Sequence, residues 1–333
     1  MSFSLEPAQR TLIALGALAA LLTACFSATS PVPATVPTVD NVPTSGAPGL
    51  TAPPTATPPA VSAPPLTPTV APSITAATDG RWDAPATWGG RLPTSGDIVS
   101  IPRGRTVELT GSSAQLEGLW IDGTLRFADT DLELSSRYVV VSGTLQAGTS
   151  SAPYRKQARI TLFGTDQTQA VMGMGTKFIG VAAGGSLQLH GEQRLAWTQL
   201  TQNAGIGATS ITLKDSPATW RSGDKIVVAP GSYDPKEAEV VTVTGVSGSS
   251  VSFTPALKYA RVAHVETIEG KLLDERPSVG LLSRNIVVRG ADDSDASAFG
   301  GHIMVMRGGS ARVSGVELSK MGQRGRFGRY PFH

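Results

Sequence analysis

The 333-residue sequence is poor in cysteine, aromatic side chains and charge, and each shortage excludes a class of protein. A single cysteine excludes an intrachain disulfide framework and any metal site built from several cysteines. Charged residues make up 16% of the chain and leave a net charge of +2, which gives no general case for nucleic-acid binding. The apolar run at residues 11–22 would reach roughly 18 Å as a helix, which is too short for a hydrocarbon core of ~30 Å.

This short apolar run is typical of an export signal. It follows Arg10 and leads directly into Leu22-Thr23-Ala24-Cys25, which is similar to the lipobox of bacterial lipoproteins. The sequence therefore predicts a lipoprotein signal peptide at residues 1–24 and a diacylglyceryl and palmitate anchor on Cys25. The alternative is an ordinary signal peptide followed by a chance cysteine. The lipoprotein interpretation predicts a bacterial cell-envelope protein that is anchored to the outer membrane or cell surface and faces outward.

The rest of the chain divides by composition. Residues 26–75 hold 13 of the 24 prolines and a single charged residue, Asp40. Proline without apolar periodicity favours extended, disordered chain, so residues 25–75 are predicted to be a tether. Only residues 76–333, which contain most of the glycine and charge, are predicted to fold.

The folded part shows a repeat of short strands. Gly123-Thr124-Leu125 recurs as Gly143-Thr144-Leu145 and again as Gly185-Ser186-Leu187, and no long segment has a helical period. A regular period with one glycine turn per unit favours an all-β solenoid, in which each coil buries its apolar side chains against its neighbours. A β-sandwich is the alternative, because short strands and glycine turns also suit that fold.

Longer strings in the same region resemble a known family. They are Trp82-Asp83, Trp88-Gly89-Gly90, Gly96-Asp97, Lys177 to Val181, Gly184 to Gly191, Trp220 to Asp224, Val279 to Ile286, Phe299 to Ile303, Val316 to Gln323 and Tyr330 to His333. Together they are similar to the G-eight (G-8) domain proteins, the family of the cell migration-inducing hyaluronan-binding protein and transmembrane hyaluronidase. The resemblance implies a G-eight domain at residues 76–200 and the start of a right-handed parallel β-helix at 201–333. It also implies a role with hyaluronan-like, uronate-containing polysaccharides.

Candidate catalytic residues are few. Cleavage of a sugar chain by hydrolysis uses paired carboxylates, whereas a lyase uses a base and a cation at a uronate. Asp224 and Glu239 lie close in sequence around a predicted strand, together with Asp234 and Glu237, and His333 follows in the last coil. Asp224, Glu239 and His333 are the candidates. A role as a turn residue is favoured for Asp224, because Gly-Asp before a strand is ordinary turn chemistry. The alternative for Glu239 and His333 is that they fix the coil through buried hydrogen bonds.

No motif predicts a cofactor. The four histidines form no ligand-spaced pair, so no metal site is predicted from them. Residues 292–295 (Asp-Asp-Ser-Asp) offer carboxylates to calcium but lack the glycine and terminal glutamate of a calcium loop, and a solvated turn is favoured. Residues 173–177 (Gly-Met-Gly-Thr-Lys) fit no phosphate-loop spacing, so no nucleotide is expected.

A basic strip near the C-terminus is the candidate binding feature. Its predicted polysaccharide-binding residues are Arg312, Lys320, Arg324, Arg326 and Arg329. A cluster of cations attracts a polyanionic glycan, although it is also consistent with a solvated face.

Two functions remain open at this stage. One is a surface lipoprotein that binds and depolymerises an acidic polysaccharide, by hydrolysis or by elimination. The other is a non-catalytic adhesion module on the same scaffold. The chain ends on the aromatic segment at residues 330–333, so the last two coils, residues 299–333, are expected to be frayed and the β-helix incomplete.

Overall fold

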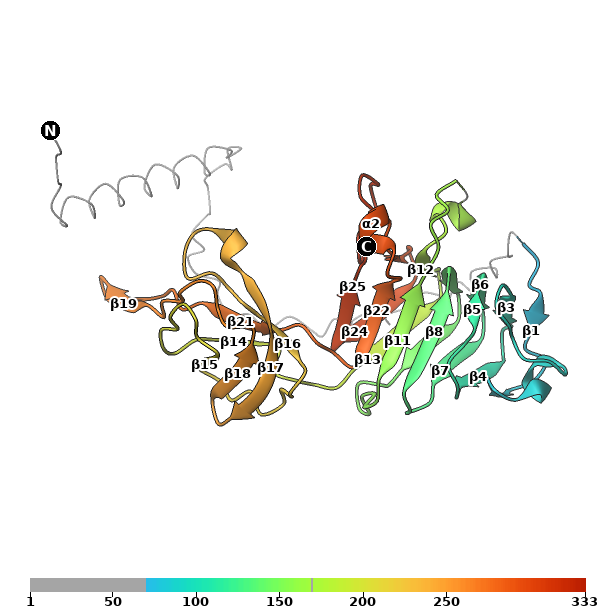
Figure 1. The fold of residues 1–333 in the computed structure, drawn as a ribbon. Helices are drawn as coiled ribbons and strands as arrows, with labels where there is room; N and C mark the ends of the chain where they lie inside the picture. Colours follow the sequence, from blue (N-terminus) through green and yellow to red (C-terminus); the bar gives the residue numbers. More distant parts are fainter. Residues whose placement is uncertain (1–69, 169) are drawn as a thin grey trace, which may run out of the picture. The chain divides into compact units, whose positions relative to one another are not determined.

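The computed structural model describes residues 70–168 and 170–333, which form an all-β protein. Three of its sheets consist entirely of parallel strands, as a parallel β-helix requires, so the predicted solenoid is confirmed and the β-sandwich is wrong (Figure 1). The predicted signal peptide, Cys25 and the tether up to residue 69 lie outside the described residues. The last two residues of the predicted tether, Ile74 and Thr75, form the first strand.

Each coil after the first contributes one strand to each of the three parallel sheets, and the first coil contributes a strand to two of them. The first sheet contains, in spatial order, β1 (Ile74–Thr75), β3 (Ile98–Ile101), β6 (Gly118–Ile121), β9 (Tyr138–Val141), β12 (Phe178–Val181) and β23 (His302–Val305). The second contains β2 (Gly80–Arg81), β4 (Thr106–Leu109), β7 (Thr124–Phe127), β10 (Thr144–Ala147), β13 (Ser186–His190) and β24 (Ser310–Ser314). The third contains β5 (Gln115–Leu116), β8 (Leu132–Ser136), β11 (Ala158–Leu162), β22 (Ile286–Gly290) and β25 (Val316–Ser319).

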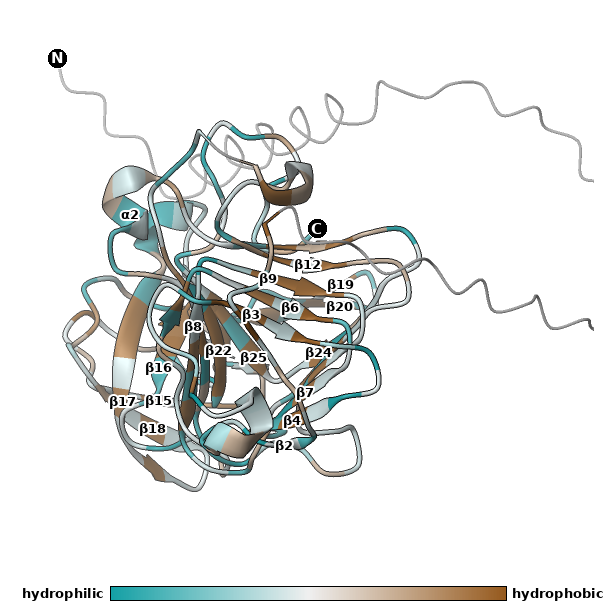
Figure 2. Ribbon diagram, turned by 90° about the vertical axis from the view of Figure 1, so that its right-hand side faces the viewer, coloured by the Kyte–Doolittle hydropathy of each residue, from teal (hydrophilic) through white to brown (hydrophobic). Residues whose placement is uncertain are grey.

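The repeat seen in the sequence sets the register of the coils. Leu125 lies opposite Leu145, which lies opposite Leu187, and all three side chains are fully buried inside the β-helix. Apolar residues accordingly concentrate on the strands rather than on the connections (Figure 2). Burial of stacked leucines is the main source of stability in a solenoid, because one coil alone cannot bury its apolar side chains.

The glycine of each repeat is required by close packing between coils. A Cβ atom at Gly143 would lie 2.0 Å from the carbonyl oxygen of Gly123, and one at Gly185 would lie 2.1 Å from that of Val141. Such distances are far below van der Waals contact, so the coils approach as closely as they do only because no side chain is present there.

A separate antiparallel sheet interrupts the β-helix between β13 and β22. Its strands, in spatial order, are β14 (Trp197–Gln199), β21 (Ser278–Leu281), β16 (Lys225–Val228), β17 (Glu239–Ser247), β18 (Ser250–Thr254) and β15 (Ser210–Thr212). This sheet has its own apolar core, which includes Trp220, Ile226 and Phe253. A two-stranded hairpin, β19 (Val265–Ile268) and β20 (Lys271–Asp274), lies within the same segment. The predicted division between residues 200 and 201 falls inside this sheet, between β14 and β15.

Helices are short in the described part of the chain. They are the 3-10 helices η1 (Pro85–Trp88), η2 (Val171–Gly173) and η3 (Pro235–Glu237), and the α-helix α2 (Ser294–Ser297). Across residues 70–168 and 170–333, no helix is long and apolar enough to cross a membrane.

The two ends of the β-helix differ in how far their core is covered. At the first coil, Trp82 and Trp88 are both buried, with ring centroids 4.9 Å apart, and they belong to the interior cluster. At the last described coil, the side chains of Val313 on β24 and Leu318 on β25 remain 37% and 36% exposed. The expected fraying of this coil stays a prediction.

Candidate functional site

Four of the five predicted basic residues come together in one cavity of about 620 Å³. The cavity lies between α2, with the residues that follow it, and residues 320–331. We call it the basic groove and define it by six of its lining side chains: Lys320, Arg324, Arg326, Phe327, Arg329 and Tyr330. Arg312 does not line it, because it lies on β24 in register with Gln188. Four residues of the predicted strip therefore line one cavity and Arg312 lies apart from them, while the role of all five in binding polysaccharide stays a prediction.

Backbone hydrogen bonds close the loop that carries the arginines. The N–H of Gln323 donates to the carbonyl of Arg329 at 3.0 Å, and the N–H of Arg326 donates back to the carbonyl of Gln323 at 3.2 Å. Gly325 and Gly328 have φ values of 72° and 75°, a region that other residues adopt only with strain. The backbone of the loop is thus held by its own hydrogen bonds, and the side chains of Arg324 and Phe327 on it are exposed.

The groove carries an excess of positive charge. Lys320 Nζ lies 2.9 Å from a carboxylate oxygen of Asp292 and 3.6 Å from one of Asp295, and the hydrogen bond to Asp292 raises the pKa of Lys320. Arg326 donates to the side-chain oxygen of Gln167 at 2.8 Å. Arg324 forms no ion pair or side-chain hydrogen bond with the described residues. The guanidinium of Arg324 is therefore available to an anionic ligand, and that of Arg326 keeps donors beyond the one that Gln167 accepts.

Two aromatic side chains flank these cations. Phe327 is 94% exposed and Tyr330 is 46% exposed, and their rings meet edge to face with centroids 6.3 Å apart. An exposed aromatic ring presents a flat apolar face, which suits the C–H face of a pyranose ring. A surface with cations beside aromatic faces suits a charged sugar chain, because the cations attract its negative charges and the aromatic faces contact its rings.

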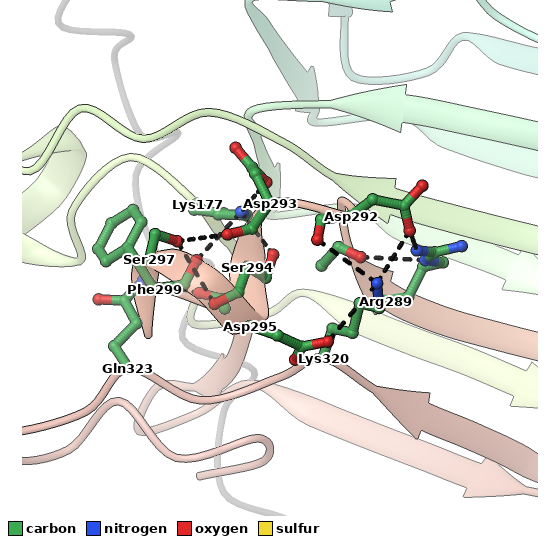
Figure 3. A network of polar contacts seen from close by, with 12 residues as sticks. Lys177, Arg289, Asp292, Asp293, Ser294, Asp295, Ser297, Phe299, Lys320 and Gln323 are labelled. Atoms are coloured by element: carbon green, nitrogen blue, oxygen red, sulfur yellow. Dashed lines mark hydrogen bonds and ion pairs between the residues drawn. The ribbon is translucent and has the colours of Figure 1, made fainter.

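A buried lysine fixes the wall of the groove. Lys177 is fully buried, and its Nζ donates to Ser294 Oγ at 2.8 Å and to the carbonyl of Phe299 at 3.0 Å (Figure 3). Burial lowers the pKa of Lys177, whereas the carboxylate of Asp293 at 3.5 Å opposes that shift. Lys177 thereby ties the start of β12 to α2, 117 positions later in the chain.

Behind the groove, His302 is buried in a neutral state. Its ring lies on Phe178 with centroids 5.8 Å apart, and Phe178 in turn stacks on Tyr138 at 5.8 Å. Burial, reinforced by the charge of Arg329, lowers the pKa of His302 to about 4. Burial also lowers the pKa of Arg329, with a further contribution from Arg326.

The three candidate catalytic residues are not brought together. Lys225 pairs with Thr242 and Val228 pairs with Glu239, so Asp224 and Glu239 sit at opposite ends of the β16–β17 ladder, roughly 13 Å apart along it. His333 lies elsewhere, beside β23, where its N–H donates to the carbonyl of Ile303 at 2.9 Å.

Both carboxylates are held by buried arginines. Asp224 binds Arg194 through both of its oxygens and accepts a further hydrogen bond from the N–H of Arg221 at 2.6 Å. Glu239 lies 2.9 Å from Arg261, whose side chain is fully buried. These contacts agree with the alternative interpretations, in which Asp224 is a turn residue and Glu239 a buried hydrogen-bonding residue. The catalytic role of the two residues stays a prediction.

The acidic segment at residues 292–295 faces cations in the structure. Asp292 contacts both Arg289 and Lys320, and Asp293 contacts Lys177 (Figure 3). Across residues 70–168 and 170–333, no group of three or more His, Cys, Asp or Glu side chains is placed to hold a metal ion.

Fold and site together define a parallel β-helix protein with a basic, aromatic-lined groove at its last described coil. Residues 87–201 match the family model described as the G8 domain, and residues 298–333 match the one described as the CEMIP beta-helix. The resemblance seen in the sequence is thus confirmed over those residues. The second match includes the whole arginine loop of the basic groove.

Two similar proteins are much longer than this chain. A G8 domain-containing protein of Dictyostelium discoideum is 33% identical over 76% of this chain and 23% of its own length. Fibrocystin-L of Mus musculus is 30% identical over 76% of this chain and 7% of its own length. The chain therefore spans less than a quarter of these relatives.

One solved structure is similar at a low level. It is the Gp54 tailspike of Acinetobacter baumannii bacteriophage AP22, in complex with A. baumannii capsular saccharide. The tailspike is 13% identical, with a TM-score of 0.27, over 58% of this chain and 29% of that one. A likeness at this level carries no argument about function.

Sequence reasoning missed three residues around the groove: Lys177, His302 and Gln323. All three lie in segments that carry the family resemblance, yet none was predicted as a site residue. A charged Lys177 directly before the buried strand Phe178–Val181 was the available signal, because a buried charge needs a dedicated partner.

Proposed function

We propose that this chain binds an acidic, hyaluronan-like polysaccharide in the basic groove. The observation that carries the proposal is the convergence of Lys320, Arg324, Arg326 and Arg329 with the exposed rings of Phe327 and Tyr330 in one cavity. A uronate chain offers both a carboxylate for the cations and a C–H face for the aromatic rings. The G8 and CEMIP beta-helix matches support the same class of ligand.

Removal of two groove arginines should weaken this binding. We expect Arg324→Ala combined with Arg326→Ala to reduce the affinity of the full chain for hyaluronan roughly 10-fold to 30-fold, since each exposed charge contact contributes up to about 1 kcal/mol. The matched control is Arg307→Ala combined with Arg312→Ala, which removes the same charge outside the groove lining and should change the affinity less than about 3-fold. Calorimetric titration provides both values. Equal losses in the two double variants would contradict the assignment of the groove.

The salt dependence of binding and the formation of products distinguish a polysaccharide-depolymerising protein from a non-catalytic adhesion module. Binding through screened, exposed charges should weaken between 50 and 500 mM salt, because the Debye length falls below about 10 Å above 0.1 M. A neutral glucan should bind less tightly than hyaluronan. Reducing ends or unsaturated products that accumulate in the same samples would show that the chain also depolymerises its ligand. Retention without products would favour the adhesion module.

We further propose that Cys25 carries the lipid that anchors the chain to a bacterial cell envelope. The support is the apolar run at residues 11–22, followed by Leu22-Thr23-Ala24-Cys25. We expect mass spectrometry of membrane-extracted protein to find acyl chains on Cys25, and Cys25→Ser to release the protein from the membrane fraction. An unmodified Cys25 in soluble wild-type protein would rule out this anchor.

A further inference from the structure

Gln323 lies beneath the basic groove and contacts one of its cations. Its side chain is only 5% exposed, and its side-chain oxygen accepts a hydrogen bond from Arg329 Nη1 at 2.9 Å. Its side-chain nitrogen donates to the carbonyl of Gly300 at 3.1 Å. Both polar atoms of this amide therefore have a hydrogen-bond partner, and these partners fix the orientation of the amide.

The chemistry of the partners decides that direction. A guanidinium only donates hydrogen bonds, so the amide oxygen of Gln323 must face Arg329. The amide nitrogen then faces Gly300 and, at 3.4 Å, Nδ1 of His302. This arrangement requires Nδ1 of His302 to lack a proton, which agrees with a ring that is buried and neutral.

A second contact restrains the same guanidinium. A Cβ atom built at Gly175 would lie 2.8 Å from Arg329 Nη1, so the guanidinium packs directly on the backbone of that glycine. Arg329 is thus held from one side by a hydrogen bond and from another by close packing. A flexible arginine loses rotamer freedom when it binds an anion, and one that is already held loses less.

We propose that Gln323 is a positioning residue, which holds Arg329 in the orientation that receives the carboxylate of an acidic glycan. Nη1 is engaged by Gln323, which leaves the other N–H groups of the guanidinium to donate to a ligand. The inference rests on the proposed function of the basic groove. In this arrangement a buried amide, that of Gln323, preorganises the groove for its ligand.

A double-mutant cycle on the full chain tests this inference. We expect Gln323→Met, which keeps the length of the side chain but removes its hydrogen bonds, to weaken hyaluronan binding about 3-fold to 10-fold. It should also reduce the salt dependence of binding to that of Arg329→Ala. Once Arg329 has been replaced by Ala, Gln323→Met should cause no further loss. The same Gln323→Met change should remain additive with Arg324→Ala, which serves as the control pair.

The outcomes distinguish the proposed function of the groove from the positioning role of Gln323. Wild-type protein that fails to bind hyaluronan would overturn the proposed function itself. Binding that is lost with Arg324→Ala combined with Arg326→Ala, while Gln323→Met and Arg329→Ala are additive, would overturn only the positioning role. If Gln323→Met does not fold, Gly175→Ala provides a second route, since its Cβ would lie 2.8 Å from Arg329 Nη1 and displace the guanidinium. The φ of 91° at residue 175 adds backbone strain to this variant, so its stability is measured beside its affinity. It should reproduce the affinity of Arg329→Ala, and unchanged affinity would contradict the inference.

Discussion

Asp224→Ala should lower the free energy of unfolding by about 3–5 kcal/mol, because it leaves the charge of Arg194 buried without its partner. The side chains of Arg194 and Asp224 are only 4% and 10% exposed, so water does not replace the lost carboxylate. The N–H of Arg221 loses its acceptor in the same variant. Urea denaturation of the wild type and the variant measures the difference.

Asp234→Ala is the matched control for this variant. Asp234 is exposed and accepts one hydrogen bond from the N–H of Lys236 at the start of η3, so its loss should cost about 1 kcal/mol. A stable Asp224→Ala protein that has lost activity toward a uronate polymer would instead favour the catalytic interpretation of Asp224.

Gly143→Ala should destabilise the β-helix by about 3 kcal/mol or more, since overpacking against a backbone cannot be relieved by a rotamer change. The new Cβ would lie 2.0 Å from the carbonyl oxygen of Gly123 and 2.5 Å from that of Asp122, so two coils must move apart. Thermal denaturation followed by circular dichroism measures the loss.

Gly184→Ala separates this packing effect from backbone strain. Gly184 has a φ of 80°, but nothing lies within 4 Å of a Cβ built there. Its replacement should therefore cost only about 1 kcal/mol, the strain of a left-handed residue. Equal losses at the two positions would show that the coils do not depend on the absence of a side chain at residue 143.

The coils of the β-helix could be predicted because their signal is local and repeated. The repeat of Gly, Thr or Ser, and Leu marks the turn of each coil, the glycine that packs closely against the neighbouring coil, and the buried leucine. The structure stacks the three copies in register. The antiparallel sheet between β13 and β22 had no such signal. Its short strands resemble those of the coils, and two of its pairs, β14 with β21 and β15 with β18, join strands that lie far apart in the chain.

The site was predictable to the same extent. Cations gathered within residues 320–329 meet in one groove because a single tight loop carries three of them, which a sequence cluster can indicate. Lys177 and Gln323 could not be identified in this way. Their importance comes from burial against residues distant in the chain, as in the contact of Lys177 with Ser294. The charge of Lys177 before a buried strand is a signal that it needs a partner, but it does not say which partner.

The most direct test of ligand binding in the basic groove is a crystal structure of the chain with a bound hyaluronan oligosaccharide. We expect sugar density in the basic groove, with a uronate carboxylate within hydrogen-bond distance of Arg324 or Arg329 and a pyranose ring against Phe327 or Tyr330. Density on another surface, with the groove open to solvent in a crystal whose lattice leaves it accessible, would contradict binding in the groove.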